Sequence, residues 1–153
     1  NQGLNLGNGM WHSGTLAAAK QAVLFGVRGI ALSAPPVEHV EGYRPLRAFA
    51  SKVLEAVFSM SNQPLLYNVN LPIAPRGIRW TRQSVRHYDG KVIEASDPQG
   101  RPIYWFTGIP IEEVEEGTDR WALSTGQVSV TPLRLDLTDE RRLAESMTKH
   151  PFG

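Results

Sequence analysis

The sequence predicts an α/β protein with a three-layer core and a β-rich extension. Two observations predict the core: an alanine-rich helical segment leads into a short apolar strand, and a second amphipathic helix leads into another strand. The third observation is a change of pattern after about residue 76, where short β-prone segments alternate with glycine, proline and aspartate turns. We therefore expect a sheet with helices on its faces, followed by hairpins.

The first helix is predicted from Gly14 to Phe25. Ser13 is a favourable N-cap, the residues after it favour a helix, and Gly26 is a natural C-terminal stop. No Glu or Gln stands three positions after Ser13, so a capping box is missing. The first N–H groups of a helix have no partner within the helix. Donors at this helix start are therefore available to a ligand.

This helix start suits an anion such as phosphate. Gly14 lets a ligand approach the backbone, and the hydroxyl groups of Ser13 and Thr15 add hydrogen bonds at the positive end of the helix dipole. The alternative is that these residues only cap the helix. Upstream, Asn1 and Asn5 supply amide oxygens, which are hard ligands suited to magnesium, manganese or calcium. An isolated Asn is otherwise a common turn former.

The remaining core elements follow in order. Gly29–Ser33 reads as a buried strand, and Arg44–Met60 reads as an amphipathic helix. Burial of each large apolar side chain on that helix is worth about 1.5 to 3 kcal/mol, so its apolar face is predicted to be core. A second central strand is predicted from Pro64 to Leu71, closed by Pro72. The apolar face comprises Leu46, Phe49, Ala50, Val53, Leu54, Val57 and Phe58.

The extension is predicted to form antiparallel hairpins. Its strands are expected at 78–82, 91–95 and 102–106, with turns at Asp89-Gly90 and at 97–100. Its aromatic residues suit either packing on the core or contacts between subunits, and they are Trp80, Tyr104 and Trp105.

The C-terminal third is predicted to hold two strands and a weak helix. The strands are expected at 121–123 and 127–135, and the helix is expected to begin at Thr138-Asp139. That helix has few apolar positions, mainly Leu143 and Met147, so it should be stable only when docked, for example on a neighbouring subunit.

Two further groups of titratable residues have a structural interpretation as well as a functional one. His87 suits a general acid, but a lone His at a turn is more often structural or exposed. The acidic cluster has metal-like chemistry, but adjacent loop carboxylates are usually solvated; its members are Glu112, Glu113, Glu115, Glu116 and Asp119. Asp119 is the exception to watch, because it precedes the segment 121–123.

Composition narrows the classes of function. The 153 residues are 41% hydrophobic and 20% charged, which is ordinary for a folded domain. A net charge of +1 gives no bulk attraction to a nucleic-acid polymer or a membrane surface. Absence of cysteine excludes disulfides, and no apolar run reaches the roughly 18 residues of a membrane span. We expect a cytoplasmic protein.

Several separated motifs, taken together and in order, resemble the SurE family, the survival-protein-E 5'/3'-nucleotidases. The resemblance extends from Asn1 to about Asp139. It begins with Asn-x-Gly-x-Asn, a glycine-rich spacer and Ser-Gly-Thr. The later motifs are Tyr67-Asn68-Val69-Asn70-Leu71-Pro72, Arg86-His87-Tyr88, the segment from Asp97 to Trp105, Gly117-Thr118-Asp119, and Val128-Ser129-Val130-Thr131-Pro132-Leu133.

This resemblance implies a Rossmann-like αβα core and a metal-dependent phosphatase that acts on nucleoside 5'/3'-monophosphates. By the resemblance Asn1 is a metal ligand, and Asn1 and Ser13 are catalytic. Asn5, Ser13, Gly14 and Thr15 line the phosphate pocket. The implied metal is magnesium or manganese, with calcium also suitable. The hairpin extension and the C-terminal segment imply a homodimer or homotetramer.

The chain also departs from the family pattern. Asn8-Gly9 replaces a pair that is often acidic, and His12 stands where an aromatic residue is common. The Asp-Asp pair and a loop Ser that complete the family's metal site have no match here. We therefore expect the C-terminal portion of a longer enzyme, inactive by itself, with residues 1–75 in the phosphatase core and 76–153 in the β-rich extension, final strand and C-terminal helix. The alternative is a non-catalytic phosphate-binding or assembly module.

Overall fold

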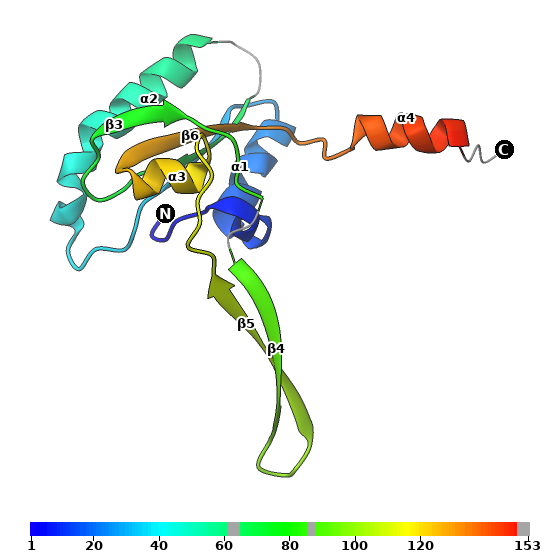
Figure 1. Cartoon of the computed structure of the whole chain (residues 1–153). Coiled ribbons are helices and arrows are strands. Elements are labelled where there is room, and N and C mark those ends of the chain that lie inside the picture. The colour runs from blue at the N-terminus through cyan, green and yellow to red at the C-terminus, as the bar shows by residue number, and fades with distance from the viewer. Residues whose placement is uncertain (61–64, 86–87, 150–153) are drawn as a thin grey trace.

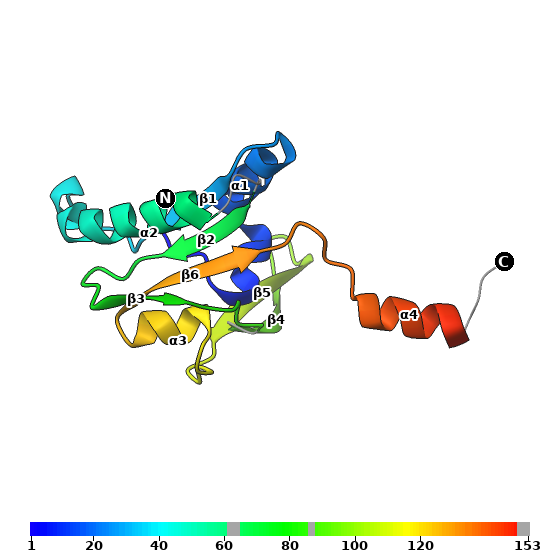
Figure 2. The same cartoon turned by 90° about the horizontal axis from the view of Figure 1, so that it is seen from above.

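A four-stranded sheet forms the centre of the computed structural model, which describes residues 1–60, 65–85 and 88–149 (Figures 1 and 2). The strand order is β1-β2-β6-β3. β1 and β2 are parallel, β2 and β6 are antiparallel, and β6 and β3 are parallel. The bounds are Gly29–Ser33 for β1, Leu66–Asn70 for β2, Gly77–Trp80 for β3 and Gln127–Leu133 for β6.

Helices cover the two faces of this sheet. α1 packs on β1 and β2, and α2 packs on the opposite face. A 3-10 turn, η1, leads into α1, and a second one, η2, leads into α2. α3 packs against β6. The bounds are Gly7–His12 for η1, Gly14–Leu24 for α1, Val40–Leu46 for η2, Arg47–Met60 for α2 and Asp119–Ser124 for α3.

Alternation along the strands divides the core between the two faces. Ile30 and Leu32 of β1 pack in the α2 cluster, whereas Ala31 between them packs against α1. In β2, Tyr67 and Val69 likewise face α2, so Asn68 and Asn70 face the α1 side. All five residues of β2 are buried, as expected for a central strand.

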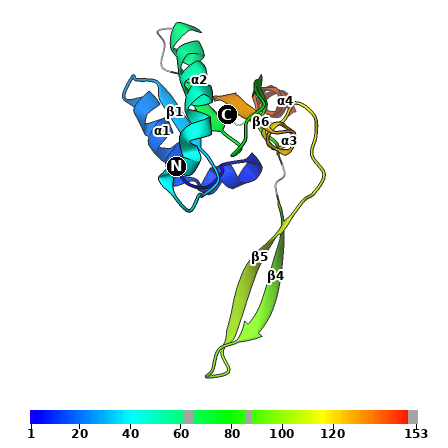
Figure 3. The same ribbon diagram turned by 90° about the vertical axis from the view of Figure 1, so that its left-hand side faces the viewer.

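Two elements project from the core. β4 and β5 form an antiparallel arm, which leaves the body of the molecule (Figures 1 and 3). α4 follows an extended segment and has no buried residue. Of the helices in the described ranges, none has the length and apolar character needed to cross a membrane. The bounds are Tyr88–Ser96 for β4, Pro102–Pro110 for β5 and Glu140–Lys149 for α4.

The structure confirms several predicted elements. α1 begins after its Ser13 cap, and Gly26 follows its last turn with φ +81°, where glycine is favoured. β1 has the predicted bounds, and β6 lies within the predicted final strand. The turn at 97–100 joins β4 to β5.

Other predictions were wrong. Asp89-Gly90 lies inside β4, where a Cβ at Gly90 would lie 2.5 Å from the exposed Phe106 ring. The strand expected at 78–82 pairs with β6 in the main sheet, not in a hairpin. Residues 121–123 are helical, because the Thr118 side chain caps α3 by accepting a hydrogen bond from the Trp121 N–H group.

The second helix also differs in detail. Its first predicted residues belong to η2, which contains Pro45, and the α-helix begins at Arg47. Val53 and Val57 are buried as expected, but Phe58 is 55% exposed with the Arg28 guanidinium over its ring. Trp80 is exposed with its ring centroid 6.2 Å from that of Tyr67, and Tyr104 and Trp105 on the arm are exposed. His87 and Pro64 lie outside the described residues.

Candidate phosphate and metal site

Asn1 lies at the carboxyl end of β1, because the first residues of the chain pair with that strand. The Asn1 nitrogen donates to the Leu32 carbonyl at 2.9 Å, and the Ala34 N–H donates to the Asn1 carbonyl at 3.1 Å. Gln2 forms a parallel bridge with Ala34. Asn1 is therefore placed at the edge of the sheet where α/β proteins commonly bind ligands.

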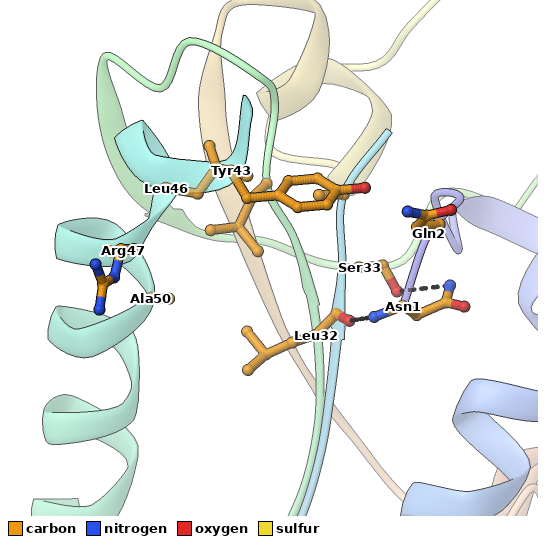
Figure 4. A pocket seen from close by; sticks show the side chains of 10 residues that line it. Asn1, Gln2, Leu32, Ser33, Tyr43, Leu46, Arg47 and Ala50 are labelled. Atoms are coloured by element: carbon orange, nitrogen blue, oxygen red, sulfur yellow. Dashed lines mark hydrogen bonds between the residues drawn. The ribbon is translucent and has the colours of Figure 1, made fainter. Parts of the chain in front are cut away.

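The Ser33 hydroxyl, at the end of β1, joins the two predicted site asparagines. Its Oγ accepts from Asn5 Nδ2 at 2.7 Å and from Asn1 Nδ2 at 3.5 Å (Figure 4). Ser33 is buried, so both amide nitrogens turn toward the sheet. In the described ranges no hydrogen bond reaches the Oδ1 atom of Asn1 or Asn5. Two hard oxygen atoms thus remain available to a cation.

The side chains of Asn68 and Asn70 in β2 hydrogen-bond to the backbone of Asn5. Asn70 Oδ1 accepts from the Asn5 N–H at 2.8 Å, and its Nδ2 donates to the Asn5 carbonyl at 3.0 Å. Asn68 Nδ2 donates to the same carbonyl at 2.8 Å. Sequence reasoning assigned no role to this pair, although two asparagines two positions apart in an apolar strand share one face of the sheet.

The N-terminus of α1 keeps two donors open. Ser13 Oγ accepts from the Leu16 N–H at 3.1 Å, so the predicted cap is confirmed and one donor is used by it. The N–H groups of Gly14 and Thr15 find no acceptor among the described residues. The first turn contains no acidic side chain, and a Cβ added at Gly14 would meet nothing within 4 Å. This helix end can therefore accept an anion.

Asn1 and Thr15 line the same groove. It runs between α1 and the outer edge of β1 and has a volume of about 500 Å³. Asn1 also borders a second cavity of about 400 Å³ on the α2 side, whose walls include Leu32, Tyr43 and Leu46 (Figure 4). Asn1 and Thr15, in the first turn of α1, therefore border one groove. Ser13, Gly14 and Asn5 line neither cavity.

The donor set fits a divalent cation only in part. Amide oxygens suit magnesium, manganese or calcium, but the described residues contain no group of three His, Cys, Asp or Glu side chains able to hold a metal ion. The glutamates at 112, 113, 115 and 116 are exposed, with Glu115 paired to Arg82, so the solvated interpretation is confirmed for them. Asp119, the fifth member of the predicted acidic cluster, is fully buried. Asn1 and Asn5 could contribute to a metal site but do not complete one.

These features define a class of protein: an α/β fold whose sheet edge presents amide oxygens beside an open helix N-terminus. The family model "Survival protein SurE" matches residues 1–90. The chain belongs to the SurE family.

Curated relatives agree with this assignment. The chain is 42% identical over 140 residues to 5'-nucleotidase SurE 1 of Thermus thermophilus, covering 90% of this chain and 56% of that protein. It is 39% identical over 154 residues to 5'-nucleotidase SurE of Chloroflexus aggregans, covering 95% of this chain and 60% of that protein. The chain thus spans less than two thirds of the length of these relatives.

A solved structure shares the fold. The crystal structure of the SurE protein from Aquifex aeolicus matches with a TM-score of 0.82 at 34% identity, over 97% of this chain and 62% of that protein. This likeness confirms the predicted α/β core together with its extension.

Proposed function

We propose that this chain forms part of a metal-dependent phosphatase that hydrolyses nucleoside 5'/3'-monophosphates to nucleoside and phosphate. The observation that carries the proposal is the groove lined by both Asn1 and Thr15, next to the start of α1, where the Gly14 and Thr15 N–H groups have no acceptor in the described ranges. The relatives named 5'-nucleotidase SurE support the reaction class and the substrate.

The chain's own residues would bind and orient the phosphoryl group. The Gly14 and Thr15 N–H groups would donate to its oxygens, and the Thr15 and Ser13 hydroxyls can donate as well. Because these donors are held by the helix, they need no rearrangement as charge builds up on the phosphoryl oxygens. Asn5, held by Ser33 and Asn70, would shape the floor beside them.

Asn1 is the residue we assign to the divalent ion, magnesium or manganese. When bound, such an ion neutralises phosphoryl charge and lowers the pKa of a coordinated water. A carboxylate normally accompanies amide ligands in such sites, and the described residues contain no group of three His, Cys, Asp or Glu side chains that would hold the ion alone. We propose a homodimer or homotetramer, for which the exposed aromatic residues of the arm are suited.

The test measures phosphate release from a panel of nucleoside monophosphates by the full-length protein, with and without chelator. Asn1→Ala should lower metal-dependent turnover by more than about tenfold and change folding stability little. Gly14→Ala should weaken phosphate inhibition, because a methyl group would enter space now open to the ligand. Gln21→Ala, exposed on the same helix, is the matched control.

Each outcome discriminates between the proposals. Turnover that resists chelation, or that survives Asn1→Ala at limiting manganese, contradicts the metal assignment. Phosphate binding at the α1 N-terminus without any turnover would instead support a non-catalytic phosphate-binding module.

A further inference from the structure

Asp119 is a fully buried carboxylate that joins three separate segments of the chain. Its Oδ1 accepts from the Ser84 N–H at 3.0 Å, from the Ser84 hydroxyl at 2.5 Å and from the Arg120 N–H at 2.8 Å. Its Oδ2 accepts from the Gly7 N–H at 2.9 Å. A buried carboxylate with this many charge-assisted hydrogen bonds holds its donors more firmly than a neutral acceptor would.

The Gly7 bond is the one that reaches toward the candidate site. Gly7 has φ +52°, a left-handed conformation that glycine adopts without strain, and it is buried. Its carbonyl accepts from Gln83 Nε2 at 3.0 Å. Both main-chain polar groups of Gly7 are therefore held by side chains more than 70 residues away in the sequence.

Gly7 starts the 3-10 turn that delivers the chain to the helix cap. Within that turn the Gly9 N–H donates to the Leu6 carbonyl, and the Ser13 N–H donates to the Met10 carbonyl, each at 3.1 Å. Met10 is buried against α1. The direction in which Ser13, Gly14 and Thr15 present their donors thus depends on the anchored glycine at the start of η1.

We propose that Asp119 is a positioning residue for the phosphate site, acting through Gly7 and η1 on the α1 N-terminus. This inference rests on the proposed function for the identity of the ligand. The anchoring of η1 can be tested without that ligand.

Asp119→Asn separates the two oxygen atoms of the carboxylate. With its oxygen in the place of Oδ1, the amide can still accept from Ser84 and Arg120. Its NH₂ group then faces the Gly7 N–H, so a donor meets a donor and that one hydrogen bond is lost. Ser84→Ala is the matched control, because it removes a hydrogen bond to Oδ1 and leaves the Gly7 bond intact.

The experiment titrates inorganic phosphate into ¹⁵N-labelled full-length protein and follows the Gly14 and Thr15 amide signals. Amide hydrogen exchange at Gly9 and Ser13 is measured in parallel without phosphate. For Asp119→Asn we expect about a tenfold higher phosphate Kd, corresponding to about 1.4 kcal/mol, and faster exchange at both amides. For Ser84→Ala we expect the wild-type Kd and wild-type exchange at these two amides.

The outcomes separate this inference from the proposed function. If wild-type protein shows no phosphate response at Gly14 and Thr15, the proposed function is wrong, while the exchange rates still decide whether Asp119 anchors η1. Wild-type exchange in Asp119→Asn overturns the positioning role. So does an equal rise in Kd for Asp119→Asn and Ser84→Ala, because the effect would then be general destabilisation.

Discussion

Replacement of Asn70 by aspartate should destabilise the protein in a pH-dependent way. Asn70 is fully buried and uses both ends of its amide on Asn5: Oδ1 accepts from the N–H, and Nδ2 donates to the carbonyl. An ionised carboxylate keeps the first bond and turns the second into a contact between two acceptors. The Asn5 carbonyl retains its bond from Asn68 Nδ2.

The magnitude follows from this arrangement. The lost hydrogen bond is worth about 1 kcal/mol, and a desolvated acceptor facing another acceptor costs about 1 to 3 kcal/mol more. We therefore expect Asn70→Asp to lower the free energy of unfolding by about 2 to 4 kcal/mol at neutral pH. Gln21→Glu, which introduces the same charge at an exposed position of α1, should change it by less than about 0.5 kcal/mol.

The loss of stability in Asn70→Asp should depend on pH. Burial and the opposing carbonyl should raise the pKa of the introduced carboxyl group above its value in the unfolded chain. The protonated form can donate to the Asn5 carbonyl, so the deficit should be smallest below the unfolded pKa. It should grow as the pH rises from that value through the raised folded pKa, and then level off.

Urea unfolding followed by tryptophan fluorescence, repeated from acidic to neutral pH, measures this deficit. A deficit that does not change across that range would refute the acceptor-against-acceptor argument. A loss below about 1 kcal/mol at neutral pH would show that Asn70 does not hold Asn5 as described.

Two further predictions concern packing and the arm. Gly29→Ala should lower the free energy of unfolding by about 3 kcal/mol, because its Cβ would lie 2.0 Å from the Ala19 carbonyl oxygen of α1. Gly14→Ala is the control, because its Cβ meets nothing within 4 Å. If urea unfolding shows no larger loss of stability for Gly29→Ala than for Gly14→Ala, the packing argument is wrong. The Arg101 N–H and guanidinium beside Asp97 lower the pKa of that carboxyl group. The stability that ionised Asp97 gives to the turn at 97–100 should therefore be present above the unfolded pKa and lost as the pH falls through the folded pKa. An NMR titration that gives Asp97 an ordinary or raised pKa would exclude this stabilisation by Arg101.

The sequence alone determined the local elements that depend on near neighbours. The N-cap at Ser13, the stop at Gly26 and the strand at 29–33 follow from side-chain chemistry and backbone preferences within a few residues. The ordered motifs are also enough to indicate the SurE family, and the family match confirms it. The anion-binding character of the α1 N-terminus is a local inference of the same kind.

Tertiary structure decided which distant residues meet. Residues 78–80 pair with β6 and not with the arm, and this pairing joins segments about 50 residues apart. Patterns within a few residues carry no information on such distant partners. The same holds for Ser33, Asn70 and Asp119, whose hydrogen bonds to Asn5 and Gly7 span between 28 and 112 positions. A buried polar side chain takes its partner from whichever segment the fold brings beside it, because burial without a partner is costly. Local sequence cannot specify that partner, and the folded sheet does.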